Sequence, residues 1–344
     1  MTLRFGIGLF TGQIPAGSSR TFAQEYRETL KLVCLAESLG FDSAWVSEHH
    51  GSSDGYLPSL LPMLAAFAAV TERIELGTGI VLTPFHEPLR LAEDAAVVDQ
   101  LSGGRLILGL GLGWREEEFR MFGVPMRERA RRTAETVEVL RRAWTGRRFS
   151  FEGRTVTYDR VKVTPPPART GGPRIFLGGY DDRAVRRAGR TADGYITDAT
   201  EPGDLERALG VLDDGAKSVG REPRSLALAL TQNAFPWRGG DHWEVLREGV
   251  TQQLGAYSAW DEGHDTPERD ELAPTPDAGE ARRWTFAGEP EEVIAALKPI
   301  VTKHADRDEL HLVVRLHYPG MDLATAARAT ELFATDVMPG LRAL

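Results

Sequence analysis

The chain has 344 residues, of which 42% are hydrophobic and 26% charged, so it is long enough to bury a large core. Its formal net charge of −9 argues against nucleic acid as a partner, and its single cysteine, Cys34, excludes an intrachain disulfide. The sequence has no run of eighteen apolar residues and no signal-peptide pattern, so we expect a cytoplasmic protein without a membrane segment.

Apolar runs of strand length alternate with longer amphipathic stretches, a rhythm typical of β-α units built on a parallel sheet. The predicted strands are 4–10, 42–48, 74–82, 106–110, 174–177, 194–197, 226–230 and 310–316. Clear helical patterns cover 22–39, 60–70, 89–101, 127–144 and 323–333. The rhythm breaks at 149–163, where apolar and polar residues alternate around Gly153 and predict a surface hairpin. It breaks again at 232–286, a stretch too long to be a single connection between two elements.

Eight strands with about eight helices predict a single (β/α)₈ TIM barrel over 1–344, with an insertion at 232–286 before the last strand. The alternative is an open doubly wound sheet, which would place a glycine fingerprint after the first strand. Thr11-Gly12-Gln13 follows that strand instead. We therefore prefer the barrel.

The second predicted strand ends on Glu48-His49-His50, at the end of a barrel strand where reactive groups are expected. Alternation places Ser47 and His49 on one face, and Val46 and His50 on the other. The polar face suits the lumen of the barrel, which makes His49 the inward imidazole and a candidate for proton transfer. Both histidines could instead bond loop backbone and do no chemistry. We expect no metal site, because no carboxylate-histidine pair elsewhere completes a ligand set.

Glycines mark two further strand ends. Gly109, Gly111 and Gly113 clear one face of the fourth strand, which would let a flat ligand approach Gly111, although tight barrel packing explains them equally well. Gly178 and Gly179 open a helix that carries a basic face, an arrangement typical of phosphate sites. Acidic side chains at the start of that helix argue against phosphate unless they are occupied in capping it.

Several stretches together resemble the bacterial luciferase-like flavin-dependent monooxygenases. They are 36–42, Glu48-His49-His50, 75–79, 91–94, 99–105, the glycines before Trp114, Gly178-Gly179, 192–194, 288–290 and 337–342. The resemblance covers nearly the whole chain outside 232–286. It implies a barrel that takes reduced FMN from a separate NAD(P)H-dependent flavin reductase, reacts it with O₂ to a flavin hydroperoxide, and oxygenates a small organic substrate.

The resemblance also implies roles for individual residues. His49 would be the general acid or base beside the flavin ring, and Glu48 would support it. The implied cofactor-binding residues are Thr78 with the Gly79-Ile80 peptide, which is cis in the family, and Gly178, Gly179 and Tyr180 at the phosphate. Bacterial luciferase has a cysteine and a phosphate-binding arginine where this chain has Gly111 and Leu112. Light emission is therefore not implied, and phosphate would depend on Arg115, Arg183 or Arg186.

Two alternatives share this fold. A deazaflavin branch of the superfamily uses coenzyme F420, transfers hydride and does not use oxygen; its members more often keep one histidine at the strand-two end, so the double histidine favours FMN. The other is a flavin-binding barrel without activity, against which Glu48-His49-His50 argues. Relatives often pair through small-residue helices, and 62–69 could serve such a homodimer.

Overall fold

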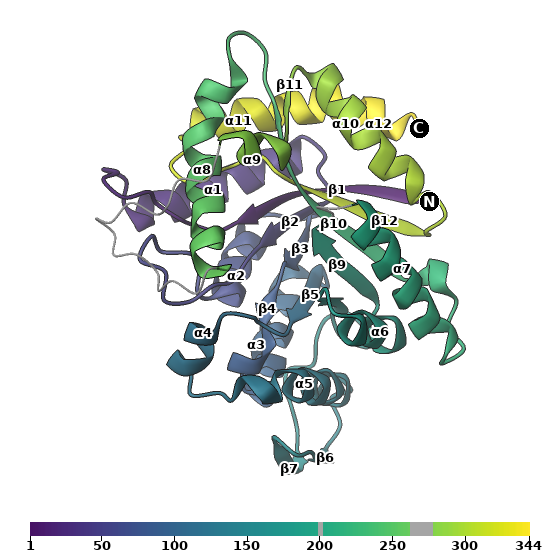
Figure 1. Cartoon of the computed structure of the whole chain (residues 1–344). Coiled ribbons are helices and arrows are strands. Elements are labelled where there is room, and N and C mark those ends of the chain that lie inside the picture. Colours follow the sequence, from purple (N-terminus) through teal and green to yellow (C-terminus); the bar gives the residue numbers. More distant parts are fainter. Residues whose placement is uncertain (199–201, 262–277) are drawn as a thin grey trace.

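The structure is a computed structural model that describes residues 1–198, 202–261 and 278–344 (Figure 1). Within these residues eight parallel strands close into a barrel, because β10 pairs with β9 on one side and with β12 on the other, and β12 pairs with β1. The barrel strands are β1 (Thr2–Phe10), β2 (Ser43–Val46), β3 (Glu75–Thr78), β5 (Leu106–Gly111), β8 (Arg174–Gly178), β9 (Gly194–Asp198), β10 (Ala227–Pro236) and β12 (Glu309–Arg315). The predicted (β/α)₈ barrel is confirmed, and the open doubly wound sheet is wrong.

Helices surround this barrel (Figure 1). They are α1 (Phe22–Ser38), α2 (Leu60–Val70), α3 (Pro88–Ser102), α4 (Glu116–Met121), α5 (Arg129–Ala143), α6 (Asp182–Thr191), α7 (Pro202–Lys217), α8 (His242–Asp261), α9 (Ala278–Arg283), α10 (Pro290–Lys303), α11 (Leu323–Leu332) and α12 (Met338–Arg342). Among the described residues, no helix is both long enough and apolar enough to span a bilayer.

The strand alternation separates two apolar cores. One fills the lumen and consists of Trp45, Ile107, Phe176, Ile196, Ala227, Ala229 and Val313. The other lies between the barrel and its helices and includes Ala44, Val46, Leu312 and Val314. Glycine makes room for the largest lumen side chain, because a Cβ at Gly77 would lie 2.2 Å from the Trp45 ring.

Ion pairs occupy the amino-terminal end of the barrel. Glu309 at the start of β12 binds Arg4 at 2.8 Å and Arg174 at 2.6 Å. Glu75, Glu309 and His311 could bring ligand atoms together for a metal. The arginines already supply the positive charge that these carboxylates need, however, so we regard the group as an ion-pair cluster.

The third and seventh strands differ in extent from the prediction. The third strand, expected over 74–82, is divided into β3 and β4 (Val81–Leu82). The peptide between Gly79 and Ile80 is cis, as the resemblance implies. The seventh strand, expected to end at Leu230, continues to Pro236, so the first residues of the 232–286 region belong to β10.

The region 232–286 adds α8, α9 and β11 (Thr285–Gly288) to the barrel, and β11 pairs with β10. Residues 262–277 lie outside the described part of the chain. The predicted hairpin is confirmed as β6 (Phe149–Glu152) and β7 (Thr157–Val161), which project from the barrel (Figure 1).

Two helical glycines give a matched test of packing. A Cβ at Gly189 in α6 would lie 2.1 Å from the carbonyl oxygen of Leu212 in α7, whereas a Cβ at Gly210 in α7 would meet nothing within 4 Å. Gly189→Ala should therefore destabilise the fold by about 1–3 kcal/mol. Gly210→Ala should stabilise it by up to about 1 kcal/mol. Urea unfolding of both variants measures this, and a neutral Gly189→Ala would contradict the close α6–α7 contact.

Candidate active site

Glu48-His49-His50 follows β2 at the carboxyl-terminal mouth of the barrel. The strand ends at Val46, two residues earlier than its predicted acidic end, and the chain continues without regular structure. All three side chains are nevertheless buried, with 1%, 5% and 8% of their surface exposed. Buried polar groups need partners, and the partners differ for each of the three.

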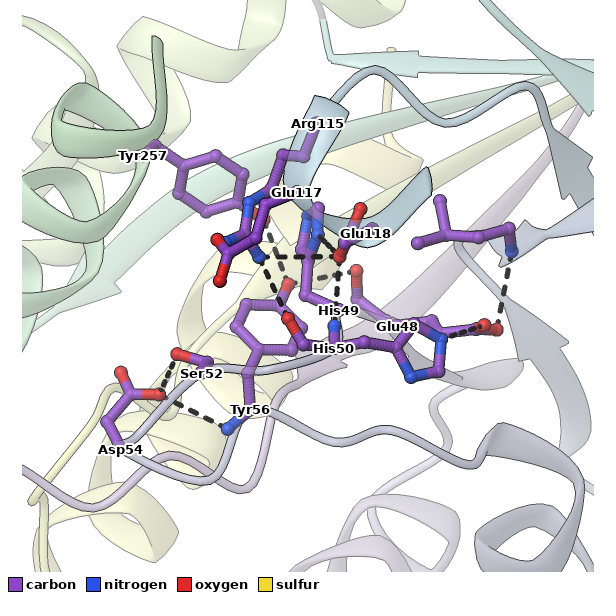
Figure 2. A network of polar contacts seen from close by, with 12 residues as sticks. Glu48, His49, His50, Ser52, Asp54, Tyr56, Arg115, Glu117, Glu118 and Tyr257 are labelled. Carbon is purple, nitrogen blue, oxygen red and sulfur yellow. Dashed lines mark hydrogen bonds and ion pairs between the residues drawn. The ribbon is translucent and has the colours of Figure 1, made fainter. Parts of the chain in front are cut away.

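Glu48 holds the second histidine. Its carboxylate contacts Nε2 of His50 at 2.7 Å (Figure 2). It also contacts Nε2 of His86 at 3.0 Å and accepts the Leu82 N–H at 3.3 Å. Burial alone would raise the pKa of Glu48, but the bonds from His50 and His86 outweigh it and hold the pKa at about 2. Glu48 therefore ties β2 to the segment after β4, and its part in catalysis stays a prediction.

His49 is held by a different carboxylate. Its Nδ1 lies 2.9 Å from Oε1 of Glu118 in α4 (Figure 2). The same oxygen accepts the backbone N–H of His50 at 2.9 Å and lies 3.4 Å from Nη1 of Arg115. A carboxylate that accepts from Nδ1 fixes the tautomer in which Nε2 is the basic nitrogen. Within the described residues Nε2 has no hydrogen-bond partner.

Sequence reasoning did not identify Glu118. The residue lies 69 positions after His49 and reaches the site from the short helix that follows β5. Three consecutive acidic residues, Glu116, Glu117 and Glu118, were visible there, but the pattern alone does not tell which one points inward. The one that does is completely buried.

Arg115 was one of three arginines considered for phosphate. The structure contradicts this role, because its guanidinium bonds Glu117 at 2.6 Å and the His50 carbonyl at 3.0 Å, and stacks on Trp260 at 4.0 Å. The side chain is buried and occupied by these contacts. Arg115 therefore supports Glu118 and the loop after β2.

Aromatic side chains enclose His49. The rings of Tyr56, Tyr257 and Trp260 have centroids 4.8, 5.6 and 4.7 Å from its imidazole. Tyr56 donates to Ser47 Oγ at 3.0 Å, and its hydroxyl lies 2.9 Å from that of Tyr257. Tyr257 and Trp260 belong to α8, so the 232–286 region supplies a wall of the site.

The predicted cofactor residues of the third and fourth strands form an apolar platform. Ile80, with Leu9, lies half-buried on the lumen core. A Cβ at Gly111 would lie 1.7 Å from Cδ1 of Ile80, so the missing side chain of Gly111 makes room for Ile80. Thr78 is fully buried and donates to the Gly109 carbonyl at 2.8 Å. Thr78 and Gly111 therefore support the platform from below.

The residues predicted for the phosphate lie after β8. Gly179 has a φ of +150°, and a Cβ there would lie 2.8 Å from that of Ala184 in α6. The Asp181 side chain accepts the Arg183 N–H at 2.8 Å and so caps α6 itself. Tyr180 is exposed and donates to Asp198 at 2.5 Å.

Arg183 faces a different surface from the expected one. With Arg186, Arg187 and Arg190 it lines an open depression along α6. Binding of a phosphate by Gly178, Gly179, Tyr180 and Arg183 stays a prediction.

A family model for luciferase-like monooxygenases matches residues 3–306. An F420-dependent glucose-6-phosphate dehydrogenase from Intrasporangium calvum is 31% identical, with 92% of this chain and 96% of the relative covered. A protein of the same name from Nocardia farcinica is 30% identical, with 92% and 95% covered.

Two solved structures resemble this chain over nearly its whole length. The monooxygenase RslO1 from Streptomyces bottropensis has a TM-score of 0.83 at 28% identity, covering 98% of this chain and 99% of that one. An F420-dependent secondary alcohol dehydrogenase has a TM-score of 0.79 at 20% identity, covering 99% and 100%, and supports the fold alone.

The expected two-component monooxygenase with reduced FMN and O₂ is wrong, because the sequence relatives that are at least 30% identical over 92% of this chain are named for F420-dependent dehydrogenation. The double histidine had favoured FMN. In the structure His50 is turned away toward Glu48 and packs against Phe122, with ring centroids 4.6 Å apart, so it says little about the cofactor.

The depressed pKa of Glu48 predicts how stability depends on pH. The unfolded carboxyl titrates near 4.5 and the folded one near 2, so ionised Glu48 stabilises the fold by about 3 kcal/mol above pH 4.5. This contribution is lost as the pH falls from 4.5 toward 2. Urea unfolding should show Glu48→Gln less stable than wild type at pH 7, with a smaller difference at pH 3. The exposed Glu152→Gln is the control, and an equal difference at both pH values would contradict the assignment.

Proposed function

The chain is an enzyme of the luciferase-like monooxygenase family, and from that premise we propose that it is a coenzyme F420-dependent oxidoreductase that removes hydride from a small alcohol. The observation that carries the proposal is the buried pair of His49 and Glu118, whose nitrogen and oxygen are 2.9 Å apart. The names of the near relatives support the choice of cofactor.

The residues at the mouth fit a deazaflavin. A tricyclic ring needs a flat apolar surface below it and polar groups at its edge. Leu9 and Ile80 provide the surface, and Thr231 and Asn233 of β10 lie half-buried at the same end of the barrel. The glycines 178 and 179 leave backbone close to α6 free of side chains, as a phosphate cradle requires. When bound, the deazaflavin supplies the hydride acceptor.

His49 supplies the base. Oxidation of an alcohol to a carbonyl removes a hydride from carbon and a proton from oxygen, and the proton needs an acceptor within hydrogen-bond reach. Nε2 of His49 is that acceptor, because Nδ1 is occupied by Glu118. The Glu118 carboxylate stabilises the imidazolium that results, and Tyr56, Tyr257 and Trp260 keep water from the imidazole.

The predicted homodimer remains a proposal. Val70 of α2 and Val97 and Leu101 of the neighbouring α3 are exposed apolar side chains that a second copy would cover. Hydride transfer to F420 would not require the flavin reductase expected for a monooxygenase.

The base assignment predicts the behaviour of His49→Ala. The wild-type protein should bleach F420 absorbance anaerobically in the presence of an alcohol, with glucose 6-phosphate among a panel of alcohols. His49→Ala should lower the rate by roughly 10²–10⁴-fold while F420 affinity, measured by its fluorescence, stays within about twofold. An F420 that neither binds nor bleaches, together with oxygen uptake on reduced FMN, would refute the proposed function.

Glu118 is expected to act through His49 as a positioning residue. Glu118→Gln should lower turnover at least about tenfold, because a neutral amide neither fixes the tautomer nor stabilises the imidazolium. Its pH-rate profile should shift relative to wild type, which a purely structural defect would not produce. Glu117→Gln is the matched control, since Glu117 bonds Arg115 but not His49. Equal losses in the two variants would show that only the α4 scaffold matters.

A further inference from the structure

Arg315 is the last residue of β12 and points into the mouth of the barrel. Alternation along β12 places His311, Val313 and Arg315 on the lumen side, since Val313 is part of the lumen core and Leu312 and Val314 belong to the outer one. Arg315 stands one layer above Val313, at the end where His49 lies. Only 5% of its surface is exposed.

The guanidinium of Arg315 has no hydrogen-bond or ion-pair partner within the part of the chain that the structure describes, and its Nη1 is fully buried. Other buried arginines are paired: Arg115 binds Glu117 at 2.6 Å and Arg307 binds Asp213 at 2.8 Å. Arginine stays charged in proteins, so burying it without a counterion is costly. A fold retains such a group where a ligand supplies the missing charge.

Arg315 and His49 share two neighbouring tyrosines. Burial raises the pKa of both Tyr56 and Tyr257, and the positive charge of Arg315 acts on both hydroxyls in the opposite direction. These are the tyrosines that flank the His49 ring. Arg315 therefore lies close enough to act on the space beside the base.

Other buried polar atoms in this part of the molecule also lack partners among the described residues. They are Oε1 of Gln13, Oε2 of Glu118, Oε1 of Gln253 and Nε1 of Trp260. Gln13 bonds Asp54 in the Tyr56 loop at 2.6 Å, and Gln253 precedes Tyr257 by one helical turn in α8. Unpartnered acceptors on the segments that carry Tyr56 and Tyr257, together with the unpartnered cation of Arg315, suit a hydroxylated organic anion.

We propose that Arg315 binds an oxyanion of the substrate, a carboxylate or a phosphate, on the β12 side of the site. This inference rests on the proposed function only in placing a substrate beside His49. The glycine cradle predicted for the cofactor phosphate follows β8, and β9 and β10 separate that strand from β12. An anion on Arg315 is thus the substrate's own.

Binding of defined probes to the full-length protein tests this without turnover. Calorimetric titration would compare glucose 6-phosphate, gluconate and neutral glucose on wild type, Arg315→Gln and Arg315→Lys. At least one anion should bind wild type more tightly than glucose does, and Arg315→Gln should weaken that anion by about 10- to 100-fold. Arg315→Lys should retain part of the affinity, and the preferred probe distinguishes phosphate from carboxylate.

Arg190→Gln is the matched control, because Arg190 lies in the arginine-lined depression along α6, where an anion could bind by charge alone. It should leave the affinity unchanged. Loss of binding in Arg190→Gln but not in Arg315→Gln would overturn the proposal, as would a wild-type protein that binds neither anion.

Two further measurements separate the remaining explanations. Arg315→Gln should leave F420 affinity unchanged. A loss of F420 affinity as large as the loss of anion affinity would mean that Arg315 holds the cofactor and would overturn the proposal. Arg315→Met should raise the Tm of the ligand-free protein, since it removes an unpaired buried charge. A lower Tm would identify a structural arginine and overturn the proposal. Anion binding that depends on Arg315 in a protein that fails to bind F420 would support this inference and refute the proposed function.

Discussion

The site depends on two buried carboxylates that hold adjacent histidines apart. Glu118 reaches His49 from α4, and Glu48 holds His50 and His86 on the other side of the same strand end. Each carboxylate offsets much of the cost of burial by accepting several N–H groups, although Oε2 of Glu118 has no partner among the described residues. Adjacent residues of an extended chain point to opposite faces, so the two imidazoles take different environments. One faces the aromatic mouth, while the other helps to fasten the loop to the barrel.

The apolar platform beneath the proposed cofactor depends on glycines, which have no side chain, in neighbouring strands. Gly77 gives space to Trp45, and Gly111 gives space to Ile80. Close packing in a barrel lumen leaves no room for a Cβ at either place. Of the two explanations for the strand glycines, these distances support tight packing, and the approach of a flat ligand stays a prediction. Gly111 makes room for Ile80, the half-buried side chain on which the proposed cofactor would lie.

The order of strands and the inward direction of His49 could be predicted because both depend on local periodicity. The split of the third strand, the length of β10 and the partner of His49 could not. Glu118 reaches His49 only because α4 folds back across the mouth of the barrel. The two residues are 69 positions apart, so no local sequence pattern predicts their contact. The cofactor was misjudged for a related reason. Two adjacent histidines in the sequence suggested that both lie in the site. In the structure His50 bonds Glu48, and only His49 faces the mouth of the barrel.

The two ends of the barrel treat buried charge in opposite ways. At the amino-terminal end Arg4 and Arg174 are matched by Glu309, and the charges are satisfied without any ligand. At the carboxyl-terminal end Arg315 of the same strand that carries Glu309 is buried without a counterion among the described residues. Burying charge costs desolvation free energy at both ends of the barrel. Only the ion pairs at the amino-terminal end offset that cost within the protein. The free energy left unrecovered at the mouth is available to a bound anion. The amino-terminal end therefore stabilises the fold, whereas the carboxyl-terminal end carries the charge that is proposed to bind the substrate's anion.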